Sequence, residues 1–244
     1  MKIIAHRGAS GEFYENTLLA FEQAIIQQCD GIELDVQYHH SGEFILLHDF
    51  LLHKKTNGKG RINDYSLEQL KNLRLVKGGA IPTLTQALKT INGRCLVNIE
   101  VKIDKKIKAC NAASFSEIIE ALTCCIKQAI KQYNFTWSHF IISSFKLELL
   151  SEIKYQTTQM NTAALIDFYP NERCLFAEEL GVMSVNPPIQ MVDKAFVDDA
   201  HKRGFQVWVY TVDTKPKIKK CADMNIDAIF TNYPQQTIER LKSF

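Results

Sequence analysis

Short apolar segments alternate with helix-like segments along almost the whole chain, and this alternation limits the possible folds more than any other feature. If the segment at residues 44–48 is the return arm of a hairpin, eight strands remain, near residues 3, 33, 97, 141, 164, 184, 208 and 229. Strands that alternate with helices favour a parallel sheet, and eight of them predict a single (β/α)8 TIM barrel. A doubly wound open sheet is the alternative, but no Gly-x-Gly-x-x-Gly motif follows any of the strands.

The chain has 244 residues, of which 46% are hydrophobic, and a barrel of this class forms one domain at such a length. No linker or repeat interrupts the pattern, so we expect residues 1–244 to form one domain. The net charge of +2 gives no reason to expect a nucleic-acid partner or stable membrane association. No apolar signal segment precedes the first strand, and seven scattered cysteines are typical of a reducing compartment, so we expect a cytoplasmic location. The oligomeric state is left open.

Residues 31–49 carry two alternating runs that are separated by Ser41-Gly42. In the first run, apolar residues alternate with the acidic residues Glu33 and Asp35, which is the period-two pattern of a strand. The two runs lie too close together for a helical crossover, so we expect a small β-hairpin with a two-residue turn and a short insertion after the second strand. That register puts His48 opposite Asp35. A surface hairpin with a solvated acidic face is the alternative.

Polar side chains gather where the predicted strands end. In a barrel of this class the carboxyl-terminal ends of the strands carry the chemistry. In chain order these ends supply His6, Arg7, Glu33, Asp35, Glu100, Lys102, Ser143, Ser144, Asn186, Tyr210 and Thr211. The three carboxylates, Glu33, Asp35 and Glu100, suit one hard divalent cation, Mg²⁺ or Ca²⁺. A buried ion pair between Glu100 and Lys102 is the alternative interpretation for those two side chains.

Two histidines and two cationic side chains complete the predicted rim. His6 and His48 fall at rim positions, where an imidazole can transfer a proton. Arg7 and Lys102 place positive charge beside the carboxylates, which indicates an anionic substrate, most simply a phosphate. The other histidines lie in predicted loops or at the starts of elements, and we expect them at the surface: His39, His40, His53, His139 and His201.

The motifs resemble those of the glycerophosphodiester phosphodiesterase family over nearly the whole chain. They are His6-Arg7-Gly8, Glu15-Asn16-Thr17, Glu33-x-Asp35, His48-Asp49, Thr56-x-Gly58, Pro82-Thr83-Leu84, Glu100-x-Lys102, Ser144-Phe145, Thr211-Val212 and Thr231-Asn232-Tyr233-Pro234. The resemblance implies a phosphodiesterase barrel that hydrolyses glycerophosphodiesters to sn-glycerol 3-phosphate and an alcohol. It also implies one divalent cation on Glu33, Asp35 and Glu100, with His6 and His48 as the acid–base pair.

Within that interpretation, Arg7 and Lys102 bind the phosphodiester oxygens, and Phe145 and Tyr210 wall the glycerol pocket. Lys54, Tyr210, Asp213 and Asn232 stand where family members often have Arg, Trp, Asn and Asp. The late motifs also resemble the sphingomyelinase D-like phospholipases, which would release a cyclic phosphate from a similar site. A non-catalytic phosphodiester-binding barrel is the other alternative, and it would be expected to lose a carboxylate or a histidine, whereas this sequence keeps all of them.

Overall fold

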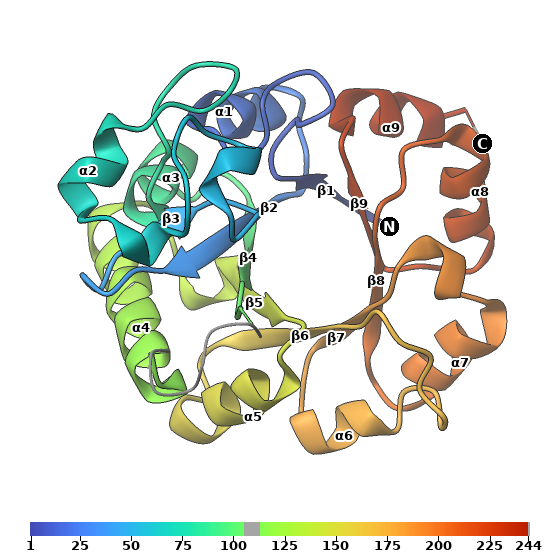
Figure 1. Cartoon of the computed structure of the whole chain (residues 1–244). Coiled ribbons are helices and arrows are strands. Elements are labelled where there is room, and N and C mark those ends of the chain that lie inside the picture. The colour runs from blue at the N-terminus through green and yellow to red at the C-terminus, as the bar shows by residue number, and fades with distance from the viewer. Residues whose placement is uncertain (105–112, 244) are drawn as a thin grey trace.

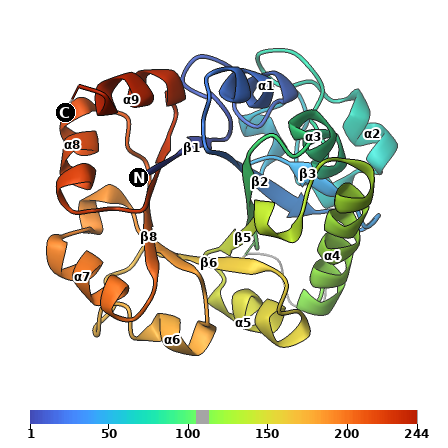
Figure 2. The ribbon, with the colours of Figure 1, turned by 180° about the vertical axis from the view of Figure 1, so that it is seen from behind.

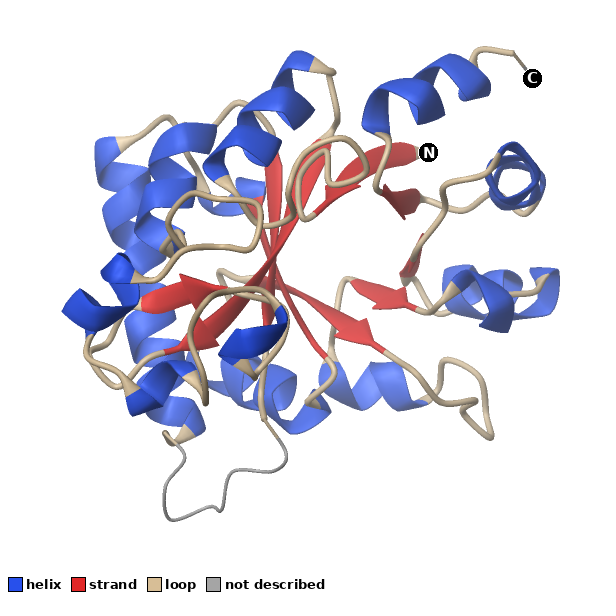
Figure 3. Ribbon diagram, turned by 45° about the horizontal axis from the view of Figure 1, so that its top comes forward, coloured by secondary structure: helices blue, strands red, loops and turns tan. Residues whose placement is uncertain are grey.

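The computed structural model describes residues 1–104 and 113–243. Its strands form an inner layer that helices surround (Figures 1 and 3). The strands are β1 Lys2–His6, β2 Gly31–Tyr38, β3 Phe44–Leu46, β4 Leu96–Val101, β5 Phe140–Ser144, β6 Asn161–Leu165, β7 Ser184–Asn186, β8 Gln206–Val209 and β9 Ala228–Thr231. The helices are α1 Leu18–Ile26, α2 Leu67–Asn72, α3 Leu84–Ile91, α4 Phe115–Gln132, α5 Leu147–Gln156, α6 Phe176–Leu180, α7 Lys194–Lys202, α8 Lys215–Asp223 and α9 Pro234–Leu241.

The sheet of nine strands closes on itself because β1 pairs in parallel with both β9 and β2. Among the strands that the structure describes, β3 pairs only with β2, in antiparallel orientation, so the other eight strands make the barrel. The predicted (β/α)8 TIM barrel with a small hairpin after the second strand is therefore confirmed. Seen from behind, the helices again lie outside the ring of strands (Figure 2). No helix in the described ranges is both long enough and apolar enough to cross a membrane.

The register of the strands decides which side chains meet at the rim. His6 pairs with Glu33, which pairs in turn with Asn98. One level higher, Asp35 pairs with Glu100. Because side chains alternate across a strand, these residues all face the barrel interior. The interior below them is filled by buried apolar side chains that include Ile4, Ile141, Trp208 and Phe230, so the polar groups meet over an apolar floor.

Helix starts follow from capping side chains. At three helix starts, the side chain of the cap residue accepts a hydrogen bond from the main-chain N–H three residues on, and the side chain of that later residue accepts one from the main-chain N–H of the cap. The pairs are Ser66 with Gln69, Thr83 with Gln86, and Ser114 with Glu117. Such reciprocal capping satisfies main-chain N–H groups that a helix end leaves unpaired. Thr17 caps α1 with its hydroxyl, which accepts from the Ala20 N–H at 3.2 Å. The loop between β1 and α1 thus ends at a defined residue.

The register of the hairpin differs from the predicted one by one residue. Val36 pairs with Leu46 and Tyr38 with Phe44, so Leu47, and not His48, would continue opposite Asp35. The reason is a longer turn: the His39 N–H donates to the Glu43 carbonyl and the Gly42 N–H donates to the His39 carbonyl, both at 2.9 Å. Gly42 has φ of 86°, a left-handed conformation that glycine adopts easily. His48 consequently lies in the loop after β3.

The insertion between β3 and α3 has an apolar cluster of its own. Its buried members are Ile45, Leu47, Leu52, Ile62, Leu70, Leu75 and Ile81. His39 is completely buried beside it, so the prediction that it lies at the surface is wrong. Its ring nitrogens bond the Ser41 hydroxyl at 2.7 Å and the Tyr65 carbonyl at 3.0 Å. The imidazole therefore fastens the hairpin turn to the insertion.

Candidate active site

The turn after β1 positions the main chain and the side chain of Arg7 at the site. Arg7 and Gly8 both have left-handed conformations, with φ of 58° and 80°, and they bend the chain sharply. A Cβ atom on Gly8 would lie 2.7 Å from the Ala20 carbonyl of α1, so the bend needs glycine. The bend aims the Arg7 main-chain N–H at Glu33 Oε2, 2.9 Å away. The Arg7 side chain then reaches Asp35, with Nε 3.0 Å from Oδ2.

Three carboxylates meet at the rim. Glu33 and Asp35 on β2 and Glu100 on β4 each offer an oxygen, and these atoms all lie within 4.8 Å of one another. Within the described ranges, the buried oxygens Glu33 Oε1 and Asp35 Oδ1 accept no hydrogen bond. Buried carboxylate oxygens that accept no hydrogen bond are costly, and a hard cation satisfies such oxygens directly. The triad therefore fits a divalent metal ion.

The charges of the triad depend on burial and on neighbouring groups. Burial, and then the Asp35 charge, raises the pKa of Glu100 to about 7. The same two causes raise the pKa of Glu33 well above its usual value. Burial would also raise the pKa of Asp35, but the positive charges of Arg7 and Lys102 outweigh it, and the pKa is lowered. Without a cation, the site therefore carries less negative charge than its three carboxyl groups could supply.

Lys102 also contacts the triad, at carboxylate oxygens other than the one that Arg7 Nε approaches. Its Nζ lies 2.8 Å from Glu100 Oε1 and 3.4 Å from Asp35 Oδ1. Burial alone would lower the pKa of Lys102, but these two carboxylates outweigh burial and raise it. The ion pair considered as an alternative is thus present, and it coexists with the carboxylate triad because Glu100 takes part in both.

The two rim histidines approach the triad from different elements. His6, at the end of β1, places Nε2 4.0 Å from Glu33 Oε2. Burial, and then the Arg7 charge, lowers the pKa of His6 to about 4. His48 enters from the loop after β3, with 35% of its side chain exposed and Nδ1 3.7 Å from Asp49 Oδ2. Burial also lowers the pKa of His48.

Gln37 holds the loop that carries His48. Its side chain is buried, and Nε2 donates to the Leu47 carbonyl at 2.7 Å and to the Asp49 carbonyl at 3.0 Å. These carbonyls flank His48 on both sides. Although the predicted register is wrong, His48 thus reaches the predicted rim, because the next polar residue on β2 fixes its loop there.

A cavity of about 270 Å³ joins these groups. Its lining residues are His6, Arg7, Glu33, His48, Asn98, Glu100, Lys102, Ser143, Phe145, Leu165, Tyr210, Thr211 and Phe230. Of the predicted site residues, only Asp35 is absent from the lining, because it is completely buried behind Arg7 and Lys102. A second cavity, of about 410 Å³, shares His48, Glu100, Lys102 and Phe145 with the first.

One wall of the smaller cavity is aromatic. The Phe145 and Tyr210 rings meet edge to face, with centroids 6.3 Å apart. The Tyr210 hydroxyl donates to the Ile166 carbonyl at 2.7 Å, so the tyrosine offers its ring to the cavity. Ser144, predicted at the rim, instead donates to the Val101 carbonyl. Asn186 is completely buried outside this cavity and accepts a hydrogen bond from Ser184.

Asn16 is a site residue that the sequence analysis named only within the Glu15-Asn16-Thr17 motif, without assigning it a role. Its buried amide Nδ2 donates to Asp35 Oδ2 at 2.9 Å, and its Oδ1 accepts from the Asp35 main-chain N–H at 3.1 Å. The neighbouring Glu15 pairs with Arg7 at 3.3 Å and with Lys55 at 3.1 Å. Two polar residues directly before the cap of a helix were the available signal.

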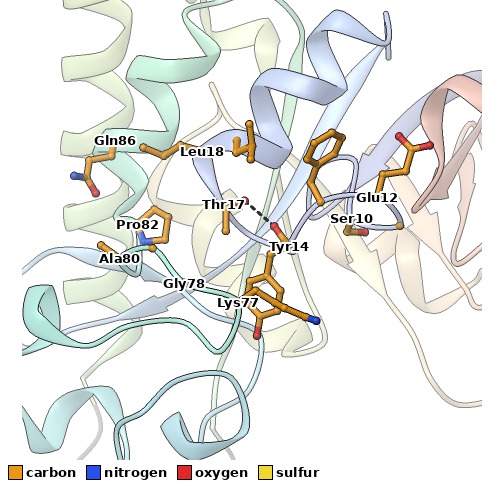
Figure 4. A pocket seen from close by; sticks show the side chains of 14 residues that line it. Ser10, Glu12, Tyr14, Thr17, Leu18, Lys77, Gly78, Ala80, Pro82 and Gln86 are labelled. Carbon is orange, nitrogen blue, oxygen red and sulfur yellow. Dashed lines mark hydrogen bonds between the residues drawn. The ribbon is translucent and has the colours of Figure 1, made fainter.

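A larger cavity, of about 800 Å³, lies on the outer side of the loop between β1 and α1 (Figure 4). Tyr14, Thr17 and Leu18 line one side, and Lys77 and Pro82 belong to the segment that faces them. None of the triad carboxylates lines it. None of its described side chains carries a buried polar atom without a partner. The smaller cavity at the rim is therefore the candidate active site.

Comparison with known proteins agrees with this site. The family model described as "Glycerophosphoryl diester phosphodiesterase family" matches residues 6–236. A glycerophosphodiester phosphodiesterase of Caldanaerobacter subterraneus is 31% identical over 248 residues, which cover 98% of this chain and 97% of that protein. Another, from Bacillus altitudinis, is 29% identical over 249 residues, with coverage of 98% and 97%.

A solved structure is similar along its whole length. It is that of an Oleispira antarctica phosphodiesterase in complex with the product sn-glycerol-3-phosphate. The TM-score is 0.86 at 25% identity, and the match covers 99% of this chain and 97% of that one. Fold, site and relatives together define a phosphoric diester hydrolase. More particularly, the chain belongs to the glycerophosphoryl diester phosphodiesterase family.

Proposed function

We propose that this enzyme hydrolyses water-soluble glycerophosphodiesters to sn-glycerol 3-phosphate and an alcohol. The observation that carries the proposal is the small rim cavity, which two imidazoles, two cationic side chains and two of the three triad carboxylates line. The Oleispira antarctica relative, solved with sn-glycerol-3-phosphate as its product, supports the same product here. The cysteine usage of the sequence further supports a cytoplasmic location.

Glu33, Asp35 and Glu100 would hold one divalent cation, Mg²⁺ or Ca²⁺. When bound, the ion supplies positive charge that favours phosphodiester binding and the transition state. Arg7 and Lys102 add further positive charge and donors suited to phosphate oxygens. Both cations already lie against Asp35, at 3.0 Å and 3.4 Å, so their positions are fixed before substrate arrives.

His6 and His48 act as a pair. One takes the proton of the attacking hydroxyl, from water or from the neighbouring glycerol oxygen, and the other gives a proton to the departing alcohol. The pair must therefore start in opposite protonation states. Burial affects both rings, but His48 keeps 35% of its side chain exposed, whereas the pKa of His6 falls to about 4. We assign the protonated state to His48 because its side chain is the more exposed of the two, at 35% against 19% for His6.

The shape of the site supports binding of the two parts of the substrate in two adjoining cavities. The cavity of about 270 Å³, with its Phe145 and Tyr210 wall, suits the glycerol phosphate part. The adjoining cavity of about 410 Å³ would take the alcohol. Its lining includes His48, Lys102 and Phe145, which it shares with the first, so the scissile bond would lie where the two cavities meet.

The test is an assay of purified protein on glycerophosphocholine, glycerophosphoethanolamine and glycerophosphoinositol, with and without EDTA. We expect sn-glycerol 3-phosphate from all three in phosphorus NMR and no turnover in excess chelator. Phosphocholine as a product would refute the proposal. A stable cyclic phosphate as the end point would favour the sphingomyelinase D-like alternative, and binding without turnover would favour the non-catalytic one.

A further inference from the structure

The His6 ring is held by a residue from the opposite end of the chain. His6 Nδ1 lies 2.8 Å from Asn232 Oδ1, and Asn232 directly follows β9. The ring therefore bonds at Nδ1 outside the cavity, while Nε2 lies on the side of Glu33, at 4.0 Å. What Asn232 presents to Nδ1 then decides which ring nitrogen carries the proton.

The amide of Asn232 has only one orientation that satisfies its neighbours. Its Nδ2 donates to Asp213 Oδ2 at 2.7 Å, and its main-chain N–H donates to Asp213 Oδ1 at 2.8 Å. The Thr231 hydroxyl also donates to Asp213 Oδ1, at 3.0 Å. A carboxylate only accepts, so the amide nitrogen must face Asp213 and the amide oxygen must face His6. Ser10, whose Oγ lies 2.8 Å from the same amide oxygen, packs beside this contact.

An amide oxygen has no proton to give. The proton in the bond between His6 and Asn232 must therefore belong to Nδ1. A neutral imidazole has one ring proton, so Nε2 carries the free lone pair, and it is Nε2 that lies toward the triad. The same logic, in which the partner of one ring nitrogen selects the state of the other, operates in other histidine sites.

We propose that Asn232 is a positioning residue that fixes His6 as the Nδ1–H tautomer and so makes Nε2 the proton acceptor of the reaction. Asp213 acts one step further away by locking the Asn232 amide. This proposal rests on the proposed function and deepens it, because it assigns the two histidines. The attacking oxygen gives its proton to His6 Nε2 as it bonds to phosphorus. The bond from phosphorus to the alcohol oxygen breaks with its electron pair on that oxygen, which takes a proton from His48.

Three variants test the amide. Asn232→Leu removes the acceptor at similar volume, so we expect a mixed or reversed His6 tautomer and a kcat about 10- to 100-fold lower, with KM little changed. Asp213→Asn unlocks the amide and should lower kcat in the same direction. In the double variant Asn232→Asp/Asp213→Asn, the carboxylate at position 232 can accept from His6, and the amide at position 213 can donate to it. We expect this swap to restore the tautomer and much of kcat.

The tautomer is read directly by two-bond ¹H–¹⁵N correlation spectra of the Mg²⁺-loaded, ¹⁵N-histidine-labelled enzyme. The His6 signals are assigned by their absence from His6→Asn. The control is Asn171→Leu, at an exposed position of the loop between β6 and α6, which should change neither spectrum nor rate. An unchanged Nδ1–H signal or an unchanged kcat in Asn232→Leu would overturn the proposal. Lack of diesterase activity in the wild type would instead refute the proposed function, and the spectra would still decide the tautomer.

Discussion

At the scale of single residues, the site brings together three carboxyl groups that repel one another when they are charged. Glu33, Asp35 and Glu100 place oxygens within 4.8 Å of one another. Burial, and then the repulsion from Asp35, outweigh the nearby cations and raise the pKa of Glu100 to about 7. The acids are therefore arranged for binding at the expense of stability in the metal-free state.

Replacing one ligand should weaken metal binding without unfolding the protein. For Glu100→Gln, which keeps the shape and removes the charge, we expect the Kd for Mg²⁺ to rise on the order of 10- to 100-fold or more. We expect turnover to be lost and the circular dichroism to stay unchanged. Isothermal titration calorimetry measures the affinity, and Glu120→Gln, on the exposed face of α4, is the matched control. Full activity of the metal-stripped wild type would contradict the assignment.

The effect of pH follows from the sign of the pKa shifts. The pKa of Glu100 is about 7 in the folded metal-free protein and 4.5 ordinarily. In the pH window between these two values, the folded protein holds a proton that the unfolded chain releases. Its stability therefore falls as pH rises through the window. Glu33 acts in the same direction, and Asp35, with its lowered pKa, acts in the opposite direction at lower pH.

A bound cation favours the charged carboxylates and removes this loss. We expect Mg²⁺ to raise the Tm of chelator-treated protein more at about pH 8 than at about pH 5, as measured by scanning fluorimetry. Glu100→Gln should reduce that difference. An equal Mg²⁺ effect at both pH values in the wild type would argue against the triad as the binding site.

Substitutions of the histidines should separate those that act in catalysis from those that hold the structure. Alanine at His6 or His48 should lower kcat on the order of 10²-fold or more, because each removes a proton-transfer step. His201→Ala provides the control, since that ring bonds Asp227 at 2.8 Å far from the rim cavity. His39→Ala should lower stability more than chemistry, because His39 is a buried link between hairpin and insertion. Steady-state kinetics with thermal melts distinguishes these effects.

At the scale of elements, the insertion after β3 presents His48 to the barrel. Its cluster is separate from the main core, and Gln37 ties its first loop to β2. We expect Leu52→Ala, at a completely buried position of this cluster, to destabilise the insertion by roughly 2–5 kcal/mol. Hydrogen exchange should rise across residues 47–81 while β4 to β6 stay protected, and kcat should fall. Uniform loss of protection over the barrel would contradict an independent cluster.

The elements also show how far sequence reasoning reaches. All eight barrel strands were predictable from the alternation of short apolar segments with helix-like segments, because each strand is a local pattern of apolar residues. The hairpin register was not, since one extra turn residue around Gly42 shifts the pairing by one. Carboxylates and histidines at strand ends were predictable from residue chemistry. The sequence did not reveal the hydrogen bonds of Asn16, Gln37 and Asn232 to the site. Each of these bonds joins residues that are distant along the chain, by 19, 10 and 226 positions respectively.

At the scale of the whole molecule, closure between β1 and β9 makes the barrel one ring of mutually supporting strands. We propose that residues 1–244 unfold as one domain. In urea, we expect the fluorescence of Trp208, which is completely buried inside the barrel, and the far-ultraviolet circular dichroism to change in one coincident transition. Two separated midpoints would refute the single domain. The variant Trp137→Phe leaves Trp208 as the only tryptophan, which keeps the fluorescence signal local.

The closure of the ring has a consequence for biosynthesis. We propose that Asn232, which bonds the His6 ring, orients it for the substrate, and β1 finds its second neighbour only when β9 has formed. Synthesis runs from the N-terminus, so His6 is made 226 residues before Asn232. The growing chain therefore carries β2 and β4, the strands of the carboxylate triad, long before it carries the residue proposed to orient His6. We therefore expect hydrolysis only from chains that have passed residue 232, so shorter growing chains should leave the cell's phosphodiesters intact.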